Sequence, residues 1–181
     1  EFQDISPQIV QWLQALHGAL ARQGETVSLM AIGDDWQSIY GWRGSSPELF
    51  MDFDKHFPAK GGAKQSRTLV LETGLPNADR NAVLVLSRRN EPLRAIEAQL
   101  DRKLPVKAYT IHRAKGLQAE VAIIVDDCLP SERHPLRSAL YAYSGFFRNS
   151  YDQAMADENL RLAYVAITRG VSRVFWYTQK A

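Results

Sequence analysis

Short apolar runs alternate with helical patterns along most of the chain, and this alternation constrains the fold more than any other feature. The runs are rich in Val and Ile and are far too short to span a bilayer, which is typical of buried strands. Strands that alternate with helices predict an α/β protein with a largely parallel sheet flanked by helices. The expected strands are residues 27–32, 68–72, 82–87, 106–111, 121–125 and 174–177, and the expected helices are residues 7–23, 47–57, 91–100 and 157–168.

Length, charge and cysteine content narrow the class of protein. The 181 residues suit one ordinary domain or two small ones, and 45% apolar residues are enough for a real core. A net charge of +2 means that any nucleic-acid site must be a local patch. The single cysteine, Cys128, excludes a disulfide framework and a thiolate metal cluster, which favours a buried thiol and a reducing, cytoplasmic setting.

The loop-like stretch 74–81, which contains Pro76, predicts a domain boundary. We therefore expect one domain at 1–75 and a second at 76–181. Residues 129–150 have no clear period, so we expect an irregular insertion with a short helix there.

Residues 33–44, Gly-Asp-Asp-Trp-Gln-Ser-Ile-Tyr-Gly-Trp-Arg-Gly, follow the apolar run 27–32 directly. Acids and an amide at the carboxyl end of a strand can face a nucleotide and its metal, because ligands of α/β sheets bind at that end. In this hypothesis Gln37 contacts a terminal phosphate through its amide. The alternative is that Asp34 and Asp35 simply cap the helical turn that follows them.

The same stretch holds three aromatic residues that do not share one helical face. Exposed rings beside Arg43 would form a platform on which the bases of single-stranded DNA stack. The alternative is packing in a core or between domains, which we favour for Trp36. For Tyr40 and Trp42, stacking and packing both stay open.

A basic turn follows the expected strand 106–111. Its backbone amides together with Thr110, His112 and Lys115 can hold phosphates, although such a turn is also compatible with simple solvation. His112 has no partner at ligand spacing, so we expect no metal there.

Arg169 ends a helix that is apolar almost all round. An arginine at the end of a buried helix can reach a γ-phosphate as an arginine finger. The alternative is that Arg169 caps the carboxyl end of its own helix, where cations are favoured.

Taken in order, these segments resemble the motifs of the UvrD/Rep-type superfamily 1 DNA helicases, most of all the helicase IV branch. Glu1-Phe2-Gln3-Asp4 resembles the end of the second motif, and the abrupt start predicts that the sequence belongs to something longer. The other matching segments are residues 31–44 (third motif), 82–90 (the strand that opens the second RecA-like domain), 109–118 (fifth motif) and 160–170 (sixth motif). The resemblance implies part of a first RecA-like lobe and a compact second lobe that lacks the accessory insertion.

The resemblance also implies ligands and residue roles. ATP, Mg²⁺ and single-stranded DNA would be bound in the parent protein. The implied catalytic residues are Glu1 as base, Gln37 at the γ-phosphate and Arg169 as finger. The implied ATP-binding residues are Asp34, Gly116, Gln118 and Arg169. The implied DNA-binding residues are Tyr40, Trp42, Arg43, Thr110, His112 and Lys115.

Four departures from the family pattern matter. The sequence contains no Gly-x-x-x-x-Gly-Lys-Ser/Thr, and no metal-binding Asp precedes Glu1. Gly74-Leu75-Pro76 replaces the usual Asn-Tyr-Arg, and Gln118 stands where the family usually has Glu.

Two hypotheses follow from the motifs and the departures. The first is part of an ATP-dependent DNA helicase that moves 3′ to 5′ and serves DNA repair or recombination. Its partner would be the missing N-terminal helicase segment, without which hydrolysis is not expected, and no membrane is involved. The second is a non-hydrolysing remnant that binds nucleic acid or protein. A small-molecule α/β enzyme is a weak third class, because no complete catalytic constellation remains.

Overall fold

The computed structural model describes residues 2–25, 27–58, 79–101, 103–126, 134–144, 147 and 149–178. The chain divides into two compact units. Unit 1 comprises Glu1–Leu71 and Glu132–Met155, and unit 2 comprises Glu72–Ser131 and Ala156–Ala181. The boundary after residue 75 stays a prediction.

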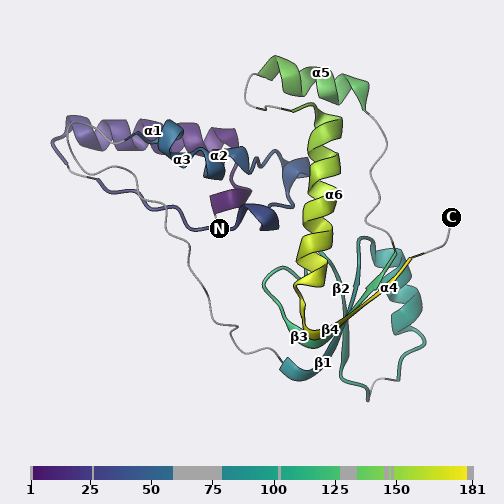
Figure 1. The fold of residues 1–181 in the computed structure, drawn as a ribbon. Coiled ribbons are helices and arrows are strands. Elements are labelled where there is room, and N and C mark those ends of the chain that lie inside the picture. Colours follow the sequence, from purple (N-terminus) through teal and green to yellow (C-terminus); the bar gives the residue numbers. More distant parts are fainter. Residues whose placement is uncertain are drawn as a thin grey trace. The chain divides into compact units, whose positions relative to one another are not determined.

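Unit 1 is built mainly from helices (Figure 1). The long helix α1 (Pro7–Arg22) has proline in its first turn, and Gly24 follows it with φ of +85°. The predicted helix at 47–57 is confirmed but is interrupted at Asp52. The remaining elements of unit 1 are the 3-10 turns η1 (Phe2–Asp4), η2 (Asp35–Gln37) and η3 (Gly41–Arg43), and the helices α2 (Glu48–Met51), α3 (Phe53–His56) and α5 (Pro135–Ser144).

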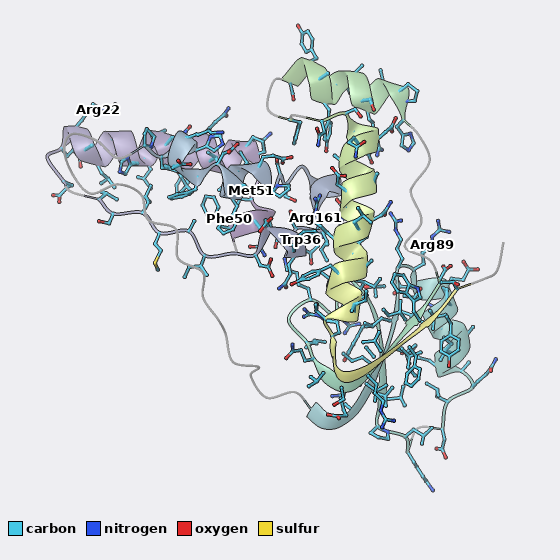
Figure 2. All side chains as sticks on the ribbon, viewed as in Figure 1. Arg22, Trp36, Phe50, Met51, Arg89 and Arg161 are labelled. Carbon is cyan, nitrogen blue, oxygen red and sulfur yellow. The ribbon has the colours of Figure 1, made fainter. Side chains whose placement is uncertain are left out.

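A small aromatic cluster anchors the start of the chain in unit 1. The ring of Phe2 lies 5.4 Å from that of Phe53, edge to face, and 6.3 Å from that of Phe50. Figure 2 labels Phe50 and its neighbour Met51 on α2. The contact therefore packs η1 against α2 and α3, the short helices that follow residues 33–44. Residues 33–44 are called the glycine-rich loop below.

The prediction of a buried strand at 27–32 is wrong in this structure. The described residues 27–32 form no strand, and Met30 and Ile32 are 82% and 58% exposed. A strand is stabilised by hydrogen bonds to a neighbouring strand, and the sheet of the described residues is formed by other segments. An apolar run without a neighbouring strand to pair with therefore does not form a strand.

Unit 2 contains a four-stranded, all-parallel sheet in the order β2-β1-β3-β4 (Figure 1). The predicted strands at 82–87, 106–111, 121–125 and 174–177 and the helices at 91–100 and 157–168 are confirmed, and the strand predicted at 68–72 lies outside the described residues. The elements are β1 (Asp79–Ser87), α4 (Asn90–Glu97), β2 (Val106–Thr110), β3 (Ala119–Val125), α6 (Tyr151–Ile167) and β4 (Gly170–Tyr177). Helix α6 contributes residues 151–155 to unit 1 and its remainder to unit 2.

The core of unit 2 combines both kinds of element. Leu86 of β1, Ile124 of β3 and Leu162 and Val165 of α6 are fully buried. This is the α/β, RecA-like arrangement of a parallel sheet flanked by helices that the alternation predicted. Among the described residues, no helix combines the length and apolar character that crossing a membrane requires.

Candidate functional site

Residues 2–5 fasten the glycine-rich loop of unit 1 at both of its ends. Before the loop, the backbone N–H of Phe2 donates to the carbonyl of Ile32 at 2.9 Å. After the loop, the N–H of Ser46 donates to the carbonyl of Ile5 at 3.4 Å. The segment that resembles the second motif therefore supports the whole loop that resembles the third.

Gln3 is the centre of this support. Its side chain is 1% exposed, and its Oε1 accepts a hydrogen bond from the N–H of Asp34 at 3.3 Å. The hydroxyl of Ser38 donates to the Gln3 carbonyl at 3.0 Å. Gly33 makes room for this contact, because a Cβ at residue 33 would overlap Oε1 of Gln3.

The nucleotide-side residues of the loop interact with one another. The carboxylate of Asp34 accepts a hydrogen bond from the N–H of Trp36 at 3.1 Å and another from the side-chain amide of Gln37 at 2.8 Å. Asp34 therefore caps η2, as one of the two hypotheses proposed. The same bond orients the Gln37 amide; the roles of both residues toward ATP stay predictions.

The DNA-side residues of the loop form a compact aromatic and cationic group. Trp42 is 55% exposed, and the guanidinium of Arg43 lies 4.5 Å from its ring centroid and 5.4 Å from that of Tyr40. Such geometry is typical of cation–π contacts and leaves ring surface open to solvent. Of the two kinds of packing that the sequence favoured for Trp36, packing in a core is wrong, because that side chain is also 55% exposed, and packing between domains stays a prediction.

Basic residues of unit 2 gather at the carboxyl edge of its sheet. Thr110 ends β2 and pairs with Ser87, which ends β1. The Thr110 hydroxyl accepts a hydrogen bond from the N–H of Arg113 at 3.3 Å and so shapes the turn that carries His112 and Lys115. Sequence reasoning missed Arg88 and Arg89, which follow β1 at this edge (Arg89 is labelled in Figure 2).

Two of the residues predicted on the ATP side of unit 2 lie at the opposite, amino edge of the sheet. Gln118 immediately precedes β3, and Arg169 immediately precedes β4. Gly116 lies next to Lys115 in the connection that runs from the end of β2 to the start of β3. The N–H of Ala119 donates to the Arg169 carbonyl at 2.9 Å, which joins the two strand starts. The sheet therefore separates the predicted DNA residue Thr110 from the predicted ATP residues Gln118 and Arg169.

The Arg169 side chain is 4% exposed and bonded within unit 2. Its Nε donates to the carbonyl of Val165 at 2.9 Å, and its Nη1 donates to the carbonyl of Leu117 at 3.1 Å. Its Nη2 donates to the hydroxyl of Thr168 at 2.9 Å. The guanidinium thus caps the end of α6 and ties it to the turn before β3; the finger role stays a prediction.

Residues 1–58 match the family model described as the UvrD/REP helicase N-terminal domain. The chain is 28% identical to DNA helicase IV of Escherichia coli K12 over an alignment that covers 97% of this chain and 32% of that protein. The chain is a relative of the UvrD-type superfamily 1 DNA helicases. Two proteins named DNA helicase II are also similar. The one from Haemophilus influenzae is 42% identical over 33% of this chain and 7% of its own length. The one from E. coli K12 is 33% identical over 58% of this chain and 12% of its own length.

This UvrD-type chain spans about a third of DNA helicase IV and smaller shares of the other relatives. Glu1, the predicted base, lies outside the described residues. Within the described part of the chain, no three His, Cys, Asp or Glu side chains form a group that could hold a metal ion. Gln3 is a third residue that sequence reasoning missed, beside Arg88 and Arg89. Its signal was Gly33, a glycine at the end of an apolar run where another segment approaches closely.

Proposed function

We propose that this chain is the DNA-gripping part of an ATP-dependent helicase that moves 3′ to 5′ along single-stranded DNA. The observation that carries the proposal is the Trp42–Arg43 pair on a loop whose other half holds Gln37. Bases stack on exposed aromatic rings, and each such contact contributes about 1–3 kcal/mol. One loop, hydrogen-bonded to residues 2–5, would thus contact both ATP and single-stranded DNA.

We further propose that DNA contacts extend to the carboxyl edge of the unit 2 sheet. Thr110, His112 and Lys115 would contact phosphates, with Arg88 and Arg89 beside them. Cationic and hydroxyl groups at one sheet edge support this assignment, because phosphate contacts position a nucleic acid without reading its sequence.

The residues of this chain do not by themselves fit ATP and Mg²⁺. The phosphate-binding Gly-x-x-x-x-Gly-Lys-Ser/Thr is absent from the sequence, and the Asp34 carboxylate already accepts two hydrogen bonds inside its loop. We propose that the N-terminal helicase segment holds the nucleotide and metal. Glu1, Gln37 and Arg169 would complete that site, with Gly116 and Gln118 on the sugar side.

Exposed apolar side chains of unit 1 support such a partner. Ile9, Trp12 and Leu16 of α1 recur at helical spacing and are 46%, 62% and 42% exposed. The run 27–32 is also exposed, although a continuous apolar run is typical of a parallel strand covered on both faces. The N-terminal helicase segment would supply the strands and helices that cover both. A role in DNA repair or recombination in the cytoplasm stays a prediction from the resemblance.

Fluorescence anisotropy with a labelled oligo-dT strand tests the proposal directly. We expect the wild-type chain to bind the single strand more tightly than a duplex of equal length. Trp42→Ala should weaken binding roughly 5- to 100-fold, the loss of one stacked base. Trp36→Ala is the matched control, because both side chains are 55% exposed. Equal effects of the two variants, or no binding by the wild type, would refute the DNA-gripping role.

An ATPase assay separates the two hypotheses from the sequence. The chain alone should not hydrolyse ATP, whereas the chain joined to an N-terminal segment of a UvrD-type helicase should show DNA-stimulated hydrolysis. The non-hydrolysing alternative predicts DNA or protein binding without turnover in either preparation. Robust turnover by the 181 residues alone would contradict both hypotheses.

A further inference from the structure

Helix α5 contacts the DNA-side half of the glycine-rich loop within unit 1. The Tyr141 hydroxyl, on α5, donates a hydrogen bond to the carbonyl of Gly41 at 3.3 Å. Gly41 is the first residue of the 3-10 turn η3, which continues with Trp42 and Arg43. The contact therefore reaches the backbone immediately before the exposed tryptophan.

The ring of Tyr141 is itself held by other aromatic rings. It stacks on Phe147 with centroids 4.0 Å apart and planes 17° apart, and it meets Tyr151 edge to face at 5.2 Å. Arg137, one helical turn before Tyr141, donates from Nη1 to the Tyr151 hydroxyl at 2.9 Å and lies 5.3 Å from that ring. A ring restrained on two sides fixes where its hydroxyl can lie.

The part of the loop that presents Trp42 and Arg43 to solvent lies between two buried residues. Ile39 and Ser45 are buried and mark the ends of this part, whereas Trp42 and Arg43 between them are exposed. Gly44 adopts a φ of +84°, a conformation that glycine enters easily. The N–H groups of Arg43 and Gly44 donate to the carbonyls of Tyr40 and Gly41 at 2.9 and 2.8 Å, so these bonds are local, whereas the Tyr141 bond ties the turn to a second element.

We propose that Tyr141 is a positioning residue for single-stranded DNA: its hydroxyl holds the Gly41 carbonyl so that Trp42 and Arg43 are presented in one orientation. Tyr141 itself touches no DNA. Helix α5, which lies in the stretch to which the sequence assigned no function, would then serve as a lateral support for the stacking loop. This inference rests on the DNA-gripping role proposed above, because ordering a loop before binding reduces the entropy lost on binding.

The variant Tyr141→Phe tests the proposal, because it removes the hydroxyl and keeps the stacked ring. We expect oligo-dT binding to weaken about 3- to 10-fold, as the loss of one ordinary hydrogen bond implies. Tyr143→Phe on the same helix is the matched control, because Tyr143 is 92% exposed, and it should bind within about 2-fold of the wild type. Tyr141→Phe should lower the melting temperature by no more than about 1–6 °C, as the loss of one hydrogen bond implies, and Tyr143→Phe should leave it unchanged.

A spectroscopic measurement needs no DNA. Trp12, Trp36 and Trp176 are replaced by Phe, which leaves Trp42 as the sole tryptophan of the four. Time-resolved fluorescence anisotropy should then show faster local motion of Trp42 in Tyr141→Phe than in Tyr143→Phe. Arg137→Met, which leaves the loop untouched, should shift Trp42 motion in the same direction by less.

The outcomes separate this inference from the function on which it rests. If the wild type binds oligo-dT and Tyr141→Phe changes neither the affinity nor the motion of Trp42, the positioning role is wrong and the DNA-gripping role stands. If the wild type does not bind, the DNA-gripping role fails, and the inference about DNA fails with it.

Discussion

The side-chain oxygen of Gln3 accepts a hydrogen bond from the backbone N–H of Asp34, which joins the start of the chain to the glycine-rich loop. Gln3 also accepts from the Ser38 hydroxyl through its own carbonyl. One residue of the segment that resembles the second helicase motif is thus bonded to both ends of η2. Displacing Gln3 should therefore disturb the loop that carries the predicted nucleotide and DNA contacts.

Replacing Gln3 by Met should destabilise the chain by about 1–3 kcal/mol, because a thioether of similar size removes the acceptor of the part-buried N–H of Asp34 and leaves a buried side chain without its hydrogen bond. The free energy of urea unfolding measures the effect. Gln11→Met on the exposed side of α1 is the control and should change stability by less than about 0.5 kcal/mol. Equal stability of the two variants would show that the Gln3 bond contributes nothing.

Replacing Gly33 by Ala should also destabilise the chain, by about 1–3 kcal/mol, because the new Cβ would overlap Oε1 of Gln3 and lie 3.2 Å from the Gln3 backbone nitrogen. Gly18→Ala is the contrasting control. Gly18 lies within α1, where the nearest atom to a new Cβ is 3.9 Å away. That variant should gain about 0.5–1 kcal/mol, since alanine favours helix interiors. Thermal unfolding should therefore show a lower melting temperature for Gly33→Ala and a higher one for Gly18→Ala. A higher melting temperature of Gly33→Ala would contradict the close approach of Gln3 to Gly33.

Replacing Arg169 by Lys should lower the free energy of unfolding, measured with urea, by about 1–3 kcal/mol. One ammonium cannot replace the three donors to Val165, Leu117 and Thr168. Arg173→Lys on exposed β4 should have almost no effect.

In a helicase completed by its N-terminal segment, Arg169→Ala should abolish ATPase activity and leave DNA binding intact. An arginine finger contributes about 10³–10⁵ in rate, so the loss should be of that size. Turnover that survives the alanine variant would limit Arg169 to its structural bonds.

Replacing Lys115 by Gln should reduce the salt dependence of oligo-dT binding, with the slope of log affinity against log salt falling by about 1. Lys115 lies on the turn that follows the carboxyl end of β2, where phosphate contacts are proposed. Lys103 precedes β2 at the other edge of the sheet, so Lys103→Gln should leave the slope unchanged. A slope that responds equally to both changes would indicate diffuse attraction instead of a contact.

The elements of unit 2 were predictable because their periodicity reflects neighbours that the described chain itself contains. The run 27–32 shows the converse: its apolar pattern suits a strand, but strand formation depends on hydrogen bonds from neighbouring strands. The Gln3 contact spans 31 positions and the Arg169–Leu117 bond spans 52, so no local pattern reveals either. The position of Arg169 at the end of a buried helix allowed either a cap of that helix or a contact with a phosphate, and tertiary packing decides which bonds the guanidinium makes in this structure.

The separation of Thr110 and Arg169 by the parallel sheet has a practical consequence for inhibition. Strands rise by about 3.3 Å per residue, so the four steps from Val106 to Thr110 place the two ends of β2 about 13 Å apart. A drug-like molecule seated against Gln118 and Arg169 would not overlap a nucleic acid held beside Thr110. Compounds selected at that edge should therefore be non-competitive with DNA, and resistance mutations against them should leave DNA affinity intact.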